Sequence, residues 1–294
     1  MLRLTALWVL VRVLGRLPGA LLYAVADAAG TATWYASTRL RSTTRDHMRH
    51  VLRHGTMDAG AAEVDRAARG CVRSAARYYA DFARSAHLSP EQAFAGAEVF
   101  EGIDLFFDAY DRGCGVIIVS AHLGNPEFIV RSARFLGLEM VVLTEPLSPP
   151  RVHDFVHRVR GAPGVRFLPA DRAGLRETLA RLRAGGIVAV LADRDIQGGG
   201  RSVPFFGERA AMPAGAVELA LRTKAALVPA FGTRTGVGRY SVTFQPPLRL
   251  RRCGDREADL NAGLRALARA LERGIEGAPE QWFVLHPVWS GLPR

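Results

Sequence analysis

Cysteine is scarce in this chain. Only three cysteines occur among 294 residues, at positions 71, 114 and 253, and they are odd in number and far apart. This pattern predicts neither a disulfide framework nor a zinc site built on cysteine. We therefore expect the protein to fold in a reducing compartment.

Lysine is nearly absent as well. Lys224 is the only one, so arginine supplies almost all of the positive charge in a formal net value of +11. A positive field favours polyanionic partners such as anionic membrane lipids, phosphorylated co-substrates or nucleic acid. The arginines are scattered, however, and the sequence carries no helix-turn-helix, zinc-finger or RNA-binding signature. Nucleic acid is therefore not an expected partner.

The chain also lacks a long uninterrupted apolar run at its start. Three arginines interrupt "MLRLTALWVLVRVLGRL", and Arg12 falls where a signal peptide would have its hydrophobic centre. A signal peptide or a spanning helix is therefore not expected. Arginines beside leucine, valine and tryptophan instead favour helices that lie on an anionic leaflet, at the cytoplasmic face of the cell membrane. The alternative is an apolar helix packed on its own domain.

Strands and helices alternate through most of the remaining chain. Such alternation predicts an α/β fold with a mainly parallel central sheet, flanked by helices. We expect this α/β unit to span residues 41–294, after a membrane-associating helical segment at residues 1–40. The expected strands are 115–121, 139–144, 165–168, 187–192, 226–231 and 240–244, and the expected helices are 58–87, 125–137, 150–160, 173–184, 214–223 and 260–275, with a polar loop between the strand ending at 192 and the helix beginning at 214.

The stretch "GVIIVSAHLGNPEFIV", residues 115–130, carries the main candidate for chemistry. It delivers His122 to the end of a buried strand and places Glu127 in the first turn of the next helix. In parallel sheets active residues collect at the carboxyl ends of strands. A carboxylate at one imidazole nitrogen fixes the tautomer and leaves the other nitrogen as a base. The alternative is a hydrogen-bonded histidine with a structural role.

No serine nucleophile accompanies this pair, since the G-x-S-x-G pattern is absent. The histidine is therefore expected to take a proton from a substrate hydroxyl. "SAHLGNPE" resembles the H-x-x-x-x-D/E signature of the lysophospholipid acyltransferase superfamily. The chain looks most like the branch that contains the late acyltransferases of lipid A biosynthesis and the actinobacterial phosphatidylinositol mannoside acyltransferases.

Three further blocks support this resemblance in order and spacing. They are "TEPL" from residue 144, "ADRDIQGGGRSVPFFGERAAMPAG" at 192–215 and "PEQWFVLHPVW" at 279–289. The likeness runs from about residue 5 to the end of the chain. One departure is Pro126, where the branch commonly carries tryptophan or another large residue before the acid. Proline is accepted in the first helical turn, so we expect the local geometry to survive.

The resemblance implies an O-acyltransferase that needs neither a metal nor a cofactor. Its co-substrate would be the thioester of acyl-CoA or acyl carrier protein, and its acceptor a glycolipid hydroxyl, with a phosphatidylinositol mannoside as the preferred candidate. His122 would be the general base and Glu127 would orient it. Backbone N–H groups at the start of the 125–137 helix would face the developing oxyanion. The alternatives are a lipid A-type acceptor, or a catalytically silent membrane-binding scaffold.

Five further residues are candidates for binding substrate. The resemblance places Glu145 and Arg160 in the active-site groove. Arginine suits an anionic group, although a surface ion pair is the other interpretation of Arg160. Asp193 and Asp195 could suggest magnesium, but the arginine between them argues against a dedicated metal site. The five candidates are Asn125, Glu145, Arg160, Arg194 and Glu208.

Four aromatic residues in these blocks have two interpretations each. Phe205 and Phe206 could line an acyl tunnel or belong to the core. Trp282 and Trp289 could anchor the chain at a membrane interface or pack its C-terminal part against the domain.

Overall fold

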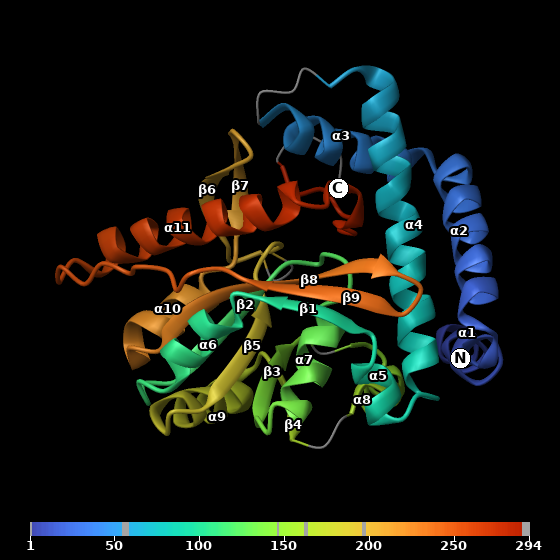
Figure 1. Cartoon of the computed structure of the whole chain (residues 1–294). Helices are drawn as coiled ribbons and strands as arrows, with labels where there is room; N and C mark the ends of the chain where they lie inside the picture. Colours follow the sequence, from blue (N-terminus) through green and yellow to red (C-terminus); the bar gives the residue numbers. More distant parts are fainter. Residues whose placement is uncertain (1, 55–58, 146, 162–163, 196–197, 290–294) are drawn as a thin grey trace.

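A seven-stranded sheet forms the centre of the molecule (Figure 1). The computed structural model describes residues 2–54, 59–145, 147–161, 164–195 and 198–289. The strands of the sheet are β1 (Ala97–Glu101), β2 (Val116–Ser120), β3 (Met140–Thr144), β4 (Val165–Pro169), β5 (Ile187–Leu191), β8 (Ala226–Gly236) and β9 (Arg239–Phe244). They lie in the order β1-β9-β8-β2-β5-β3-β4, and all neighbours are parallel except β8 and β9. The predicted α/β fold with a mostly parallel sheet is confirmed.

Helices cover both faces of the sheet. All five residues of β2 are buried, as expected for a strand in the middle of a covered parallel sheet. Successive side chains point to opposite faces, so Ile117 and Val119 join one hydrophobic cluster while Val116 and Ile118 join another. The first cluster includes α9 (Arg172–Arg183), α10 (Gly215–Thr223) and α11 (Arg256–Glu276), and the second includes α6 (Ile103–Tyr110) and α7 (Pro126–Phe135).

The long helices of the N-terminal part lie to one side of the sheet (Figure 1). They are α1 (Leu2–Arg12), α2 (Gly19–Ala36), α3 (Thr38–His54) and α4 (Ala61–Ser85). Helix α2 packs on α4 through Leu22, Tyr23 and Ala26, and Asp27 forms ion pairs with two arginines of α4. None of the described helices is both long enough and apolar enough to cross a membrane.

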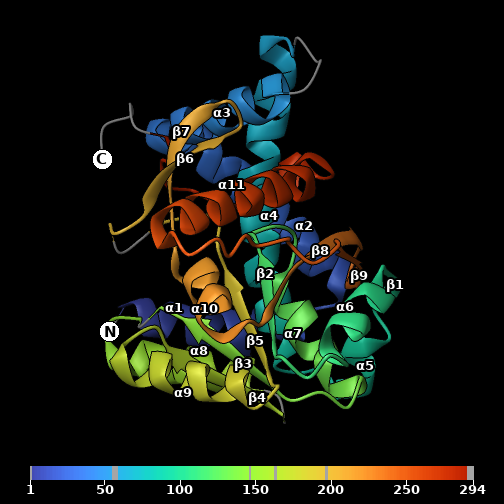
Figure 2. The same cartoon turned by 90° about the vertical axis from the view of Figure 1, so that its left-hand side faces the viewer.

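Several elements lie outside the sequence-based predictions. The segment expected to be a polar loop contains a two-stranded antiparallel hairpin, β6 (Arg201–Phe205) and β7 (Glu208–Met212). Figures 1 and 2 both show this hairpin projecting past α11 towards α3. Alternate residues of each strand are buried, but the exposed Pro204 and Ala211 are apolar too, so the sequence shows no clear alternation of apolar and polar residues. The other unpredicted elements are α3, β1, α6 and the short α5 (Pro90–Phe94). The expected helix 58–87 corresponds to α4, and its first expected residue lies outside the described part.

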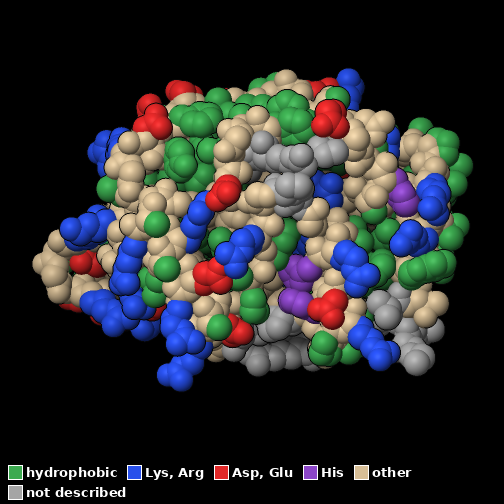
Figure 3. Space-filling model, turned by 90° about the horizontal axis from the view of Figure 1, so that it is seen from below, with side chains coloured by type: hydrophobic (Ala, Val, Ile, Leu, Met, Phe, Trp, Pro, Cys, Tyr) green, Lys and Arg blue, Asp and Glu red, His purple; other side chains and the backbone are tan. Residues whose placement is uncertain are grey.

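The positive charge is distributed rather than concentrated. On the face seen in Figure 3, basic side chains stand singly or in small groups among hydrophobic side chains, with acidic side chains between them. This arrangement agrees with the scattered arginines of the sequence. A continuous basic stripe of the kind that tracks a nucleic acid backbone is not visible on this face.

Candidate active site

His122 lies at the carboxyl end of β2, where a second strand end supplies its partner. Its Nδ1 lies 2.7 Å from Oδ1 of Asp193, and its backbone N–H donates to Oδ2 of the same carboxylate at 2.8 Å. Asp193 follows β5, which pairs with β2 in parallel, so the two strand ends meet. A carboxylate at Nδ1 holds the proton there and leaves Nε2 as the basic nitrogen. The ring is about one-fifth exposed, which keeps it accessible to a substrate.

Asp193 is fully buried and ionised. Burial alone would raise the pKa of Asp193, but the nearby His122 ring and the N–H groups of Trp282 and His122 lower it below its usual range. The indole Nε1 of Trp282 donates to Oδ2 at 2.9 Å. The carboxylate therefore accepts three hydrogen bonds, and it is fixed in both position and charge.

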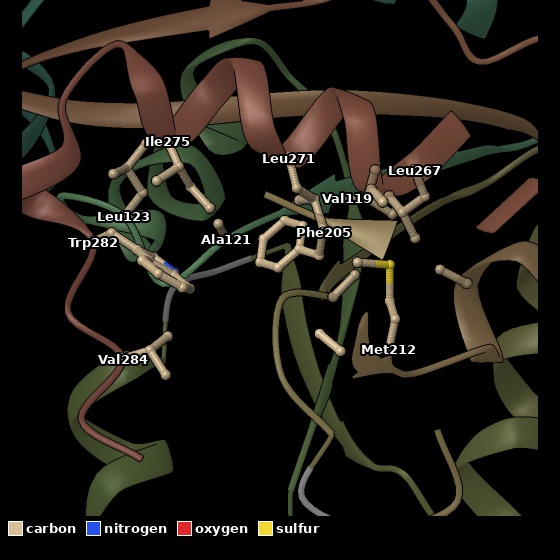
Figure 4. Close-up of a cluster of buried hydrophobic side chains, with 14 of the residues drawn as sticks. Val119, Ala121, Leu123, Phe205, Met212, Leu267, Leu271, Ile275, Trp282 and Val284 are labelled. Carbon is tan, nitrogen blue, oxygen red and sulfur yellow. The ribbon is translucent and has the colours of Figure 1, made fainter. Parts of the chain in front are cut away.

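The C-terminal part of the chain closes over this end of the sheet. Trp282 follows the short 3-10 helix Pro279–Gln281, and its indole is completely buried. Figure 4 shows it beside Leu123 and Ala121 in the cluster that also holds Phe205. The N–H of Phe283 donates to the carbonyl of His122 at 2.9 Å. The segment "PEQWF" thus holds His122 in place through its hydrogen bonds to the His122 carbonyl and to Asp193.

The aromatic residues with two interpretations belong to the core. Phe205, Phe206, Trp282 and Trp289 are all at most 4% exposed. Trp289 donates from Nε1 to the carbonyl of Phe205 at 3.0 Å and stacks on His50. These contacts show that both tryptophans pack the C-terminal part against the domain.

Glu127 is not the partner of the His122 ring, which corrects the expectation from the sequence. Its Oε1 lies 2.6 Å from Nε of Arg160 and accepts a hydrogen bond from the Tyr78 hydroxyl at 2.7 Å. Arg160 belongs to α8 (Pro150–Arg160), and Tyr78 to α4. The first turn of α7 thus carries Glu127 towards these two helices, while Asp193 reaches the ring from the neighbouring strand.

Arg160 is likewise engaged inside the protein. Besides its ion pair with Glu127, it donates from Nη2 to the Tyr78 hydroxyl at 3.0 Å. Its side chain is about one-fifth exposed, and its pKa is raised because the opposite charge of Glu127 outweighs the cost of burial. The structure therefore agrees with the ion pair at a helix end, and it does not present Arg160 as a free anion receptor.

Other charged groups gather beside His122. Arg194 donates from Nη2 to Oε2 of Glu145 at 3.4 Å, and both side chains are partly exposed. The pKa of His286 responds to the charges of four neighbours, which are Arg194, Glu145, Arg39 and His122. The pKa of His286 is lowered, first by burial and then by the two arginines. The predicted pair Glu145 and Arg194 is thus brought to the same edge as His122.

The remaining two binding candidates lie elsewhere. Asn125 is 8% exposed, and its Nδ2 lies 3.5 Å from the Asp81 carboxylate. Glu208 is in β7, where its Oε2 accepts a hydrogen bond from Nε2 of His50 at 2.7 Å. The structure therefore places Glu208 with α3 and not with the charged groups around His122.

Some backbone donors near the start of α7 are engaged within the fold. The N–H groups of Leu123, Gly124 and Asn125 donate to the carbonyls of Ala121, Gln281 and Gly232 at 2.7–3.0 Å, and Pro126 has no N–H. Gly124 has a φ of +57°, and a Cβ there would lie 2.3 Å from the carbonyl oxygen of Gly232. This tight turn therefore engages the N–H of Asn125, one of the donors that the sequence assigned to an oxyanion.

The two aspartates after β5 have separate roles in the fold. Asp193 binds His122 and Trp282, whereas Asp195 accepts the N–H groups of Gly198 and Gly200 at 3.1 and 2.8 Å. Over the described residues, no group of three or more His, Cys, Asp or Glu side chains is arranged to hold a metal ion.

Comparison with known proteins connects this geometry to one family. A family model described as bacterial lipid A biosynthesis acyltransferase matches residues 2–290. A phosphatidylinositol mannoside acyltransferase of Mycolicibacterium smegmatis is 28% identical over 225 residues, which cover 75% of this chain and 71% of the relative. A phosphatidylinositol mannoside acyltransferase of Mycobacterium tuberculosis (strain ATCC 25618 / H37Rv) is 28% identical over 199 residues, which cover 65% of this chain and 60% of the relative.

Proposed function

The chain belongs to the bacterial lipid A biosynthesis acyltransferase family, and from this membership we propose that it acylates a hydroxyl of a phosphatidylinositol mannoside. The donor in this proposal is the thioester of acyl-CoA or acyl carrier protein. Two relatives named as phosphatidylinositol mannoside acyltransferases support the acceptor. The observation that carries the chemistry is the His122–Asp193 pair at the joined ends of β2 and β5.

In the proposed mechanism, Nε2 of His122 accepts the proton of the acceptor hydroxyl while that oxygen attacks the thioester carbonyl. The new ester C–O bond forms and the C–S bond breaks, and the departing thiolate takes the proton back from the imidazolium as a thiol. Asp193 stabilises the imidazolium and holds its orientation throughout. The transfer is direct, without an acyl-enzyme.

The charged groups beside His122 provide the polar part of the proposed site. Arg194 and Arg39 lie close enough to His286 to act on its charge, as His122 does, and Glu145 pairs with Arg194. Guanidinium groups suit the phosphates of either substrate. They also suit the negative charge that develops on the thioester oxygen during the proposed attack.

The proposed location is the cytoplasmic face of the cell membrane, with residues 1–40 lying on anionic lipid. Support comes from large apolar side chains of α1 and α2 that remain exposed while the opposite side of α2 packs on α4. Arginines flank this exposed surface, as in interfacial helices. The exposed side chains are Trp8, Val9, Val13, Leu21, Val25 and Tyr35, each at least 40% exposed.

The test combines purified protein, palmitoyl-CoA and membrane lipids that contain phosphatidylinositol mannosides, with products read by mass spectrometry. We expect a mannoside species that gains one acyl mass with the wild type and with His54→Ala, whose partner is Glu276. His122→Ala should give no such species. Product from His122→Ala at the wild-type rate would remove this histidine as the base.

Two alternative functions have their own outcomes in the same assay. A parallel incubation with a lipid A precursor tests the other acceptor of the family. Binding of lipid vesicles without product from any donor and acceptor pair would instead favour a silent membrane-binding scaffold.

A further inference from the structure

A cavity lies next to the catalytic segment, and His122 does not line it. It has a volume of about 290 Å³ and opens between α4, α5, α7 and the turn that joins β8 to β9. Its apolar wall consists of Phe82, Leu88, Ala95, Phe128 and Val237. Its polar lining includes two carboxylates and two arginines, so the balance of charge decides what it can hold.

Both carboxylates are already neutralised by buried partners. Asp81 pairs with Arg234 at 2.7 Å, and both side chains are 4% exposed. Glu127 pairs with Arg160 at 2.6 Å on the side facing α8. Neither carboxylate therefore contributes a free negative charge to the cavity.

The two arginines have no such compensation among the described residues. Arg131 donates only to uncharged oxygens, those of Ser85 and the carbonyl of Val159, at 3.0–3.4 Å. Burial lowers the pKa of Arg131, and the charge of Glu127, which is already paired with Arg160, offsets this only in part. Arg84 forms none of the ion pairs found in the described part, and it lies against the backbone at Gly19 and Gly238. The cavity therefore carries a net positive charge.

An unpaired acceptor also points into this region. The side chain of Asn125 is 8% exposed, and its Oδ1 has no hydrogen-bond partner among the described residues. A buried polar atom of this kind normally has a partner, either in the protein or in something bound. Asn125 lines the cavity, so a ligand or its water can supply the missing donor.

The mouth of the cavity adjoins the exposed apolar surface of the N-terminal helices. A Cβ at Gly19, the first residue of α2, would lie 2.8 Å from Cγ1 of Val237, so α2 begins beside the cavity wall. Val237 is 43% exposed, and Leu21 and Val25 of α2 are 50% and 40% exposed. An apolar chain leaving the cavity would continue over this surface without entering bulk water.

We propose that this cavity binds the anionic head group of a lipid, a phosphate or carboxylate carried on an alkyl chain. Arg84 and Arg131 hold the oxyanion, and the apolar wall holds the first methylene groups. The site needs neither His122 nor a thioester, so it is independent of acyl transfer. A soluble anion lacks the apolar part, and a neutral lipid would leave both guanidinium groups uncompensated.

Isothermal titration of the full chain tests this site with decyl phosphate, inorganic phosphate and decyl maltoside, each below its micelle concentration. We expect one site for decyl phosphate and binding at least about tenfold weaker for the other two probes. Arg84→Gln should weaken decyl phosphate by about tenfold or more, since a charge-assisted contact is lost. Ala95→Phe should abolish binding by filling the mouth, because Ala95 is exposed and the larger ring can be accommodated there.

Arg265→Gln, an exposed arginine on α11, is the matched control and should bind like the wild type. Thermal unfolding confirms that each variant is folded. Unchanged binding in both Arg84→Gln and Ala95→Phe would overturn the site. Equal affinity for inorganic phosphate would overturn the lipid part of the proposal, and equal affinity for decyl maltoside would overturn the role of the charge. Failure of acyl transfer with intact decyl phosphate binding would affect the proposed function alone.

Discussion

Replacement of Asp193 by asparagine tests the catalytic geometry most directly. The native carboxylate accepts three hydrogen bonds: Oδ1 faces Nδ1 of His122, and Oδ2 receives the His122 backbone N–H and the Trp282 indole. Asparagine has one acceptor oxygen and one amide NH₂ group in their place. The asparagine side chain in Asp193→Asn can take two orientations, with its NH₂ group in the Oδ1 or in the Oδ2 position. The favoured orientation is the one in which the NH₂ group faces fewer N–H donors.

The balance favours an amide NH₂ that points at His122. If the NH₂ group took the Oδ2 position, it would meet two buried N–H donors, and each unsatisfied donor costs about 1–3 kcal/mol. If it takes the Oδ1 position, it donates to Nδ1 and forces the proton onto Nε2. The second arrangement wins by roughly 2 kcal/mol or more. His122 would then present a donor where the reaction needs a base.

We expect kcat of Asp193→Asn to fall by about 10³-fold or more. The tautomer preference contributes part of this loss, and the absent stabilisation of the imidazolium contributes the rest, as in other histidine–carboxylate pairs. Single-turnover acyl transfer at neutral pH measures the rate without product release. Asp195→Asn is the matched control, because Asp195 only accepts two backbone N–H groups. A rate for Asp193→Asn within tenfold of the wild type would refute this reasoning.

Three further predictions follow from buried groups. Trp282→Phe removes one donor to Asp193 and should lower kcat by about tenfold in the same assay, with folding checked by circular dichroism; an unchanged rate would separate the indole from catalysis. Glu127→Gln should lower the free energy of unfolding by about 2 kcal/mol in urea titrations, less than for a fully buried pair because its partner is one-fifth exposed; wild-type stability would contradict this. Burial lowers the pKa of His47 to about 3. Between about pH 6.5 and 3 the histidine is therefore protonated in the unfolded chain and neutral in the folded chain. The free energy of unfolding should fall as the pH falls through this range. His47→Phe should show a shallower loss between pH 7 and pH 4 in the same titrations.

The sequence predicted the framework of the sheet because its signals are local. β2, β3 and β5 are short apolar runs that closely follow a glycine, and the helices between them have the helical period. The hairpin of β6 and β7 was missed because its partly exposed residues and glycines resemble a loop. The hairpin depends on tertiary contacts with α11 and α3, and such contacts are not visible in the local sequence.

The partner of the histidine was missed for a different reason. The sequence predicted His122 at a strand end, but it offered Glu127 as the nearest carboxylate in the chain. Asp193 is 71 residues away from His122 and becomes adjacent only because β5 lies beside β2. Strand order in a parallel sheet depends on how the crossovers pack, and no single stretch of sequence records it. Trp282 was predicted either to anchor the chain at a membrane interface or to pack its C-terminal part, and its hydrogen bond to Asp193 could not be predicted for the same reason.

The position of Glu127 still matters for the site, through the wall beside the histidine. Its partner Tyr78 stacks on Phe283, with ring centroids 4.8 Å apart, and the Phe283 ring meets the His122 ring at 5.8 Å. The ion pair with Arg160 therefore sets the place of an aromatic wall next to the reacting nitrogen. Loss of this carboxylate shifts that wall and leaves the proton on Nδ1 of His122. Glu127→Gln should thus raise KM and lower stability while the pH profile of kcat is kept, because the base and its own carboxylate are intact. A pH profile displaced by this substitution would show that Glu127 acts on the imidazole after all.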